Sequence, residues 1–60
     1  EQNYIGMVMT AEEDMGETSK IKVSGIYWTA YNKGKIIKKG EQYTIIGIEG
    51  NKLVVSLKED

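Results

Sequence analysis

Residues 25–40, GIYWTAYNKGKIIKKG, place three aromatic side chains within five positions and four lysines within the next eight. Aromatic rings can stack on nucleic-acid bases, and lysine ammonium groups can neutralise phosphates. The stretch could therefore hold a single nucleic-acid strand between stacking tyrosines and basic side chains, namely Tyr27, Tyr31, Lys33, Lys35, Lys38 and Lys39. The alternative is a core strand followed by a solvated loop.

The overall charge weighs against nucleic acid. The chain has 60 residues, eight basic and nine acidic, with a net charge of −1, and its pI is about 5.4. Dedicated nucleic-acid-binding domains are usually basic, often with a pI above about 9. All eight basic residues are lysines, so the bidentate guanine and phosphate contacts typical of arginine are absent. A local basic patch is still compatible with these numbers.

The residue types offer little for catalysis. Histidine and cysteine are both missing, which removes imidazole acid–base chemistry, thiolate chemistry and zinc sites built on these ligands. The acidic triplet Glu12-Glu13-Asp14 lacks the alternating spacing of a calcium loop and is interpreted as a solvated acidic loop. No glycine-rich phosphate loop is present. We expect no enzymatic activity within these residues, and no cofactor or metal site.

Alternation of apolar and polar residues dominates the chain and predicts an all-β fold. Five short strands are expected, at residues 4–10, 19–24, 27–31, 42–49 and 52–57. Ser24-Gly25 and Gly50-Asn51 are predicted tight turns between neighbouring strands.

Gly47 lies inside a predicted strand and indicates a β-bulge. The bulge would let Tyr43 and Ile45 face inward and then shift the alternation so that Ile48 faces inward too.

A domain with so many short strands is expected to curl into a small barrel, with the OB-fold and the SH3-like barrel as candidates. Its two longest loops are acidic at residues 11–18 and basic at residues 32–40. The basic loop is too short and glycine-rich for the helix that an OB-fold usually carries between its third and fourth strands. That helix is expected to be missing.

Several apolar side chains are expected to face outward. Trp28 and Ala30 share one face of their strand and are assigned to the core, which leaves Tyr27 and Tyr31 on the surface. One of the adjacent Ile36 and Ile37 must also point away from the core. With Ile26 at a turn and Val54 opposite in phase to its neighbours, these residues predict an exposed apolar patch, which marks a protein partner more often than a small ligand. Alternatively, they only close the bottom of the barrel.

The order of glycines and strand residues resembles the C-terminal soluble domain of the NfeD family. The resemblance rests on Gly25-x-x-Trp28-x-Ala30, then Ile37-x-x-Gly40, then Tyr43-x-Ile45-x-x-Ile48-x-Gly50-x-x-Leu53-x-Val55, with Gly6-x-x-x-Thr10 at the start. It covers nearly the whole chain. Two departures affect the first loop: Glu12-Glu13-Asp14 replaces the family's Leu-x-Pro, and the second strand begins a few residues late.

The resemblance implies a five-stranded OB-fold barrel without the usual helix, as a single domain over residues 1–60 taken from a longer membrane-anchored protein. It implies a non-enzymatic protein-interaction module that pairs with stomatin, prohibitin or flotillin-type (SPFH) membrane proteins, although longer family members carry a separate serine protease domain. We expect a soluble domain at the cytoplasmic face of the cell membrane.

The expected contact surface combines the exposed apolar residues with the lysine loop, which could also meet anionic lipid headgroups; its members are Ile26, Tyr27, Tyr31, Val54, Lys33, Lys35, Lys38 and Lys39. A single-stranded nucleic-acid-binding domain is the alternative, and a structural spacer without a partner is a third interpretation.

Overall fold

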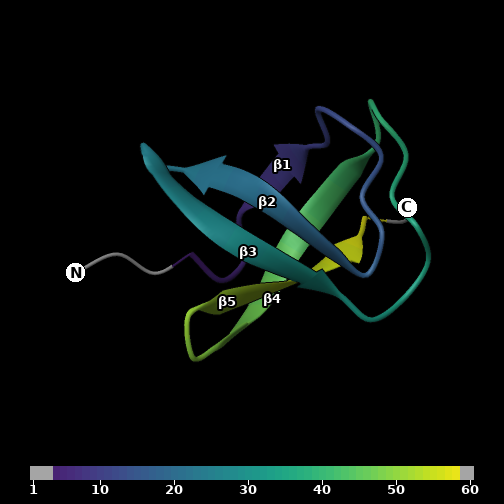
Figure 1. Cartoon of the computed structure of the whole chain (residues 1–60). Helices are drawn as coiled ribbons and strands as arrows, with labels where there is room; N and C mark the ends of the chain where they lie inside the picture. The colour runs from purple at the N-terminus through teal and green to yellow at the C-terminus, as the bar shows by residue number, and fades with distance from the viewer. Residues whose placement is uncertain (1–3, 59–60) are drawn as a thin grey trace.

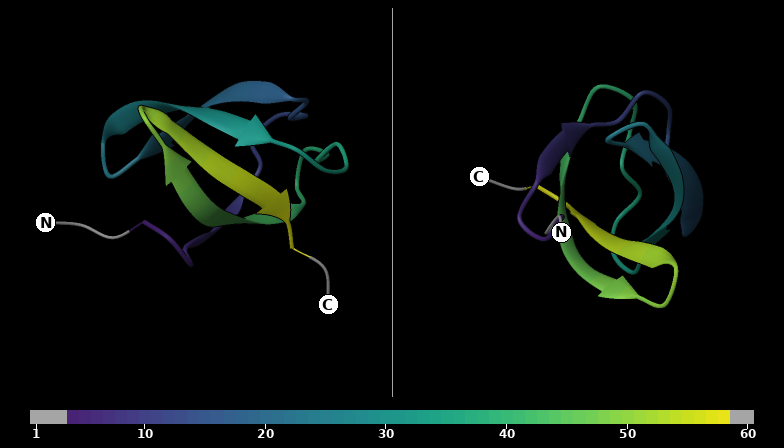
Figure 2. Two further views of the ribbon diagram at one scale, coloured as in Figure 1. Left: turned by 90° about the horizontal axis from the view of Figure 1, so that it is seen from below. Right: turned by 90° about the vertical axis from the view of Figure 1, so that its left-hand side faces the viewer.

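The computed structural model describes residues 4–58 as five strands wound into a curled half-barrel (Figures 1 and 2). The strands are β1 (Val8–Thr10), β2 (Thr18–Val23), β3 (Ile26–Asn32), β4 (Gln42–Glu49) and β5 (Lys52–Leu57). They form one sheet in the order β1-β4-β5-β3-β2. The predicted all-β fold is confirmed, and the described residues between β3 and β4 contain no helix. Within residues 4–58 no helix is long and apolar enough to cross a membrane.

Two hairpins make up most of the sheet. β2 and β3 are joined by Ser24 and Gly25, which have φ angles of 53° and 81°. Two successive positive φ values give the tight turn whose twist matches that of the flanking strands. β4 and β5 are joined by Gly50, with φ 61°, and Asn51. Both predicted turns are confirmed.

A parallel ladder joins the hairpins. β3 pairs with β5 from Thr29↔Lys52 to Asn32↔Val55. Because paired residues of neighbouring strands point to the same face of a sheet, the two hairpins share one inner face. Figure 2 shows this face wrapped into the interior of the half-barrel.

The predicted bulge in β4 is also present. Ile45 pairs with Val55 and Gly47 pairs with Val54, so that Ile46 is the extra residue. Beyond the bulge Ile48 pairs with Leu53, so its side chain points to the same inner face of the sheet, as the sequence predicted. Ile48 is nevertheless 44% exposed, in the part of β4 that lies beyond its pairing with β1. The predicted inward direction of Ile48 is therefore confirmed, although the side chain stays partly exposed.

The core consists of apolar side chains from every strand and from both long loops. Its most deeply buried large members are Ile37, Ile45, Leu53, Val23 and Val55. Each such side chain contributes about 1.5–3 kcal/mol when it leaves water. Of the adjacent isoleucines, Ile37 is fully buried and Ile36 is 60% exposed, which confirms that one of them points outward.

Two predictions, on residues 4–7 and on Trp28, need correction. Residues 4–7 are a turn and not part of the first strand, because Gly6 has φ 98° and the Met7 amide donates to the Tyr4 carbonyl at 3.1 Å. Trp28 is half-buried and packs against the edge of the core, with its ring edge-on to Tyr4 at 5.5 Å between centroids. It therefore contributes to the core without being enclosed by it.

Candidate binding groove between two sheet edges

The half-barrel has an open seam between β1 and β2. These strands are consecutive in the sequence, yet they form the two edges of the sheet, and no ladder joins them within residues 4–58. A sheet edge presents unpaired backbone donors and acceptors, which makes it a natural template for another strand.

The hydrogen-bond pattern shows which backbone groups of β2 face the seam. In an antiparallel pair, alternate residues bond to the partner strand, while those between them direct their amide and carbonyl away. The Asn32 amide donates to the Glu17 carbonyl at 2.8 Å. In this register the same parity makes residues 19, 21 and 23 the bonded members of β2. Thr18, Lys20 and Lys22 therefore direct their backbone groups into the seam.

The opposite edge is shorter. The Ile45 amide donates to the Met7 carbonyl at 2.9 Å and the Ala11 amide donates to the Glu41 carbonyl at 2.8 Å. Because residues 7 and 11 therefore bond to β4, the backbone groups of Val8 and Thr10 are directed away from it. The two edges therefore face each other with unpaired polar groups.

The connection between β1 and β2 keeps the seam open, because it pairs with a different part of the chain. Met15 and Ile37 form an isolated antiparallel bridge, with N···O distances of 2.6 and 3.1 Å. The Lys39 amide also donates to the Asp14 carboxylate at 2.8 Å. Residues 11–15 therefore follow the basic loop instead of continuing along β2.

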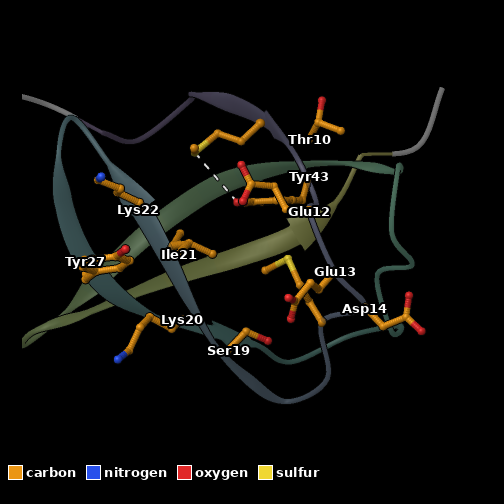
Figure 3. Close-up of a pocket in the computed structure, with 12 residues that line it drawn as sticks. Thr10, Glu12, Glu13, Asp14, Ser19, Lys20, Ile21, Lys22, Tyr27 and Tyr43 are labelled. Carbon is orange, nitrogen blue, oxygen red and sulfur yellow. Dashed lines mark hydrogen bonds between the residues drawn. The ribbon is translucent and has the colours of Figure 1, made fainter.

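The seam is a groove of about 420 Å³, within the size range of ligand and peptide sites. Apolar side chains from the core and its margin line it, namely Met9, Met15, Ile21 and Tyr43. Figure 3 shows Ile21 and Tyr43 between β2 and the segment that carries Glu12 to Asp14. The groove is acidic along that segment and basic at Lys20 and Lys22 on β2.

The acidic wall has an electrostatic effect on the groove. Burial, and then the negative charge of Glu12, raise the pKa of Tyr43 above its ordinary value of 10.0. The Tyr43 hydroxyl is directed towards the Met9 sulfur at 3.9 Å, a weak acceptor. In residues 4–58 neither Glu12 nor Glu13 forms an ion pair. The same residues contain no cluster of three or more side chains able to hold a metal ion.

Tyr27 stands at the rim of the groove. It is 65% exposed, and its neighbour Ile26 at the hairpin turn is 55% exposed. The ammonium groups of Lys20 and Lys22 lie 5.6 and 5.5 Å from the Tyr27 ring centroid, within the range of cation–π attraction. Two of the residues proposed from the sequence, Ile26 and Tyr27, are therefore exposed, and Tyr27 also lines the groove.

Val54 does not belong to that surface. It lies outside the core cluster, in agreement with its predicted outward direction, but it is only 7% exposed. It pairs with Tyr31 in the parallel ladder and with Gly47 across the hairpin, so its neighbours cover it. The expected exposure of Val54 was wrong.

Tyr31 and the lysine loop are already engaged within the molecule. Tyr31 is half-buried, with the ammonium groups of Lys33 and Lys52 at 5.5 and 5.9 Å from its ring centroid. Lys33 also forms an ion pair with Glu49 at 3.4 Å. The remaining loop lysines, Lys35, Lys38 and Lys39, are exposed and do not line the groove. The basic loop and Tyr27 therefore do not form one continuous site.

Sequence reasoning missed most of the groove. Two of its lining residues are methionines, a flexible and polarizable side chain that often lines adaptable binding surfaces. All three methionines of the chain lie within residues 7–15, which was a usable signal. The acidic triplet was treated as a solvated loop, although it also forms a wall of the groove.

Comparisons of the sequence and of the fold with known proteins point to the same family. The profile of a family described as "NfeD-like C-terminal, partner-binding domain" matches residues 1–56. Among solved structures, the fold is similar to the C-terminal domain of stomatin operon partner protein 1510-C from Pyrococcus horikoshii, with a TM-score of 0.76. The two are 31% identical, and the match covers 95% of this chain and 91% of that chain. No curated protein matches the sequence.

Proposed function

Because the chain belongs to the NfeD family and spans its C-terminal partner-binding domain, we propose that it docks a stomatin, prohibitin or flotillin-type (SPFH) membrane protein. The open groove and its rim at Ile26 and Tyr27 are the proposed contact surface. The observation that carries the proposal is the exposure of Tyr27 at the rim of a groove whose lining includes apolar side chains, together with the exposure of the neighbouring Ile26. Exposed apolar surface of this kind marks an interaction site.

The lysine loop has an accessory role in this proposal. Lys35, Lys38 and Lys39 lie outside the groove and are exposed. Beside a bilayer, each would add about 1 kcal/mol of attraction to anionic lipid headgroups. They would hold the domain near the cytoplasmic face of the cell membrane while the groove binds the protein partner.

A binding measurement tests the proposal. The purified SPFH protein from the same organism is immobilised, and the domain is titrated over it together with two variants. Tyr27→Ala should weaken binding at least about tenfold, since it removes about 1.4 kcal/mol or more from an exposed aromatic contact. Ile36→Ala removes a similarly exposed apolar side chain away from the groove and should bind like the unmodified chain. Absence of binding, or equal affinity of both variants, would refute the proposal.

A further inference from the structure

We propose that the seam accepts an extended segment of a partner protein as a sixth strand, added along the open edge of β2. The segment alternates apolar side chains, which face the groove, with acidic side chains, which face outward beside Lys20 and Lys22. The inference deepens the proposed function and rests on it for the source of the segment, whereas the mode of binding follows from the sheet edge alone.

The backbone of β2 supplies the first argument. Thr18, Lys20 and Lys22 direct their amides and carbonyls into the seam, because the alternate residues carry the bonds to β3. These positions are spaced two residues apart along a six-residue strand, which is the repeat at which an added strand forms hydrogen bonds. An added strand would lie about 4.8 Å from β2.

The inner side of the seam supplies the second argument. Successive side chains of an added strand point alternately inward and outward. Those that point inward would meet Met9, Met15 and Ile21, which line the groove. Since Met15 and Ile21 are 4% and 8% exposed, the groove reaches the margin of the core. Apolar side chains fit this position.

The outward side supplies the charge complementarity. Lys20 and Lys22 are exposed on the outer face of β2 and have no carboxylate partner in the part of the chain that the structure describes. Opposite charges at facing positions of neighbouring strands stabilise the pair, and like charges destabilise it. An added strand with acidic outward side chains is therefore favoured.

The same lysines disfavour a second copy of this chain as the occupant. If two copies paired through β2, lysines would face lysines across the new ladder, and edge lysines commonly prevent such self-association. Glu12 and Glu13 lie on the wall of the groove opposite β2 (Figure 3), so an acidic side chain that pointed towards that wall would be repelled. The groove therefore favours acidic side chains only where they lie beside Lys20 and Lys22.

The experiment uses two blocked heptapeptides, one alternating valine with glutamate and the other alternating valine with lysine. Amide hydrogen exchange of the domain is followed by NMR with each peptide. The valine–glutamate peptide should slow exchange several-fold at Thr18, Lys20 and Lys22, since these amides gain hydrogen bonds. Ser19 and Ile21 are internal controls, because their amides already bond to β3. The valine–glutamate peptide should also bind about fivefold more tightly than the valine–lysine peptide.

A charge-reversal variant gives the matched control. Lys20→Glu combined with Lys22→Glu changes only exposed side chains, and it should reverse the preference between the two peptides. Unchanged exchange at the three seam amides with the valine–glutamate peptide, or a preference that the variant leaves unaltered, would overturn the inference. If the SPFH protein binds while these amides stay unprotected, only the mode of binding fails. If the peptide adds to β2 while the SPFH protein does not bind, only the proposed partner fails.

Discussion

At the scale of single residues, two tyrosines on the same face of β3 have different surroundings. Tyr31 lies beside the buried Val54 in the parallel ladder and between two lysine ammonium groups. Tyr27 is 65% exposed at the rim of the groove. The first side chain therefore supports the fold, whereas the second is available to a partner.

This difference predicts that truncation of the two tyrosines affects stability to different extents. Tyr31→Ala uncovers Val54 and should lower the free energy of unfolding by about 1–3 kcal/mol. Tyr27→Ala removes an exposed ring and should change it by no more than about 0.5 kcal/mol. Denaturant unfolding of both variants measures the two values. Equal losses would mean that Tyr31 contributes no more to the fold than an exposed residue.

Tyr43 reports on the charge of the groove. Burial and the carboxylate of Glu12 raise its pKa, so Glu12→Gln should lower that pKa, while burial keeps it above 10.0. The contribution of the neutral Tyr43 phenol to the free energy of unfolding is fully present below pH 10.0. It should fall as the pH rises from 10.0 towards the raised pKa, because the unfolded state loses the phenol proton first. The chemical shift of a Tyr43 ring carbon, followed against pH, measures the pKa of its hydroxyl. Glu13→Gln is the control, and an unchanged Tyr43 pKa in Glu12→Gln would contradict the interpretation.

At the scale of elements, the glycines at turns and in the bulge have different requirements. Gly25 has φ 81° in the β2–β3 turn, a conformation that costs other residues about 1–2 kcal/mol. Gly47 in the β4 bulge has no positive φ, and a Cβ there would lie 3.8 Å from the Cβ of Val54, which is an ordinary contact.

Alanine substitution should separate these two roles. Gly25→Ala should lower the free energy of unfolding by about 1–2 kcal/mol, and Gly47→Ala should leave it within about 0.5 kcal/mol. Thermal or denaturant unfolding compares them directly. A large loss in Gly47→Ala would show that the bulge depends on the glycine itself.

The bounds of a strand could be predicted well where alternation and a turn, both read from neighbouring residues, define it. The bounds of β4 and β5 match the prediction, because alternation and a short turn define them together. The first strand was predicted too long, since alternation continues through Gly6 although the backbone turns there. The groove could not be predicted in this way. It exists because Met15 pairs with Ile37, 22 residues away in the chain, and no local pattern encodes such a pairing.

At the scale of the whole molecule, charge distribution opposes the nucleic-acid interpretation. The lysines near Tyr27 and Tyr31 lie over the tyrosine rings, where bases would have to stack. The groove next to Tyr27 carries three acidic residues, and the net charge is −1.

A short single-stranded oligonucleotide at low salt should therefore leave the amide chemical shifts of Tyr27, Tyr31 and residues 33–39 unchanged. Low salt gives electrostatic binding its best opportunity, since counterion release is then most favourable. Localised shifts that fade as salt is added would instead identify a nucleic-acid-binding domain and displace the protein-interaction proposal.

The parallel ladder between β3 and β5 has a consequence for how the chain reaches this structure. Each hairpin closes over a two-residue turn, so each forms from neighbouring residues at little entropic cost. Their junction instead brings together Thr29 and Lys52, and it must close a much longer loop. Docking of the two preformed hairpins is therefore expected to limit the folding rate, with Ala30 and Leu53 forming their contact in the transition state.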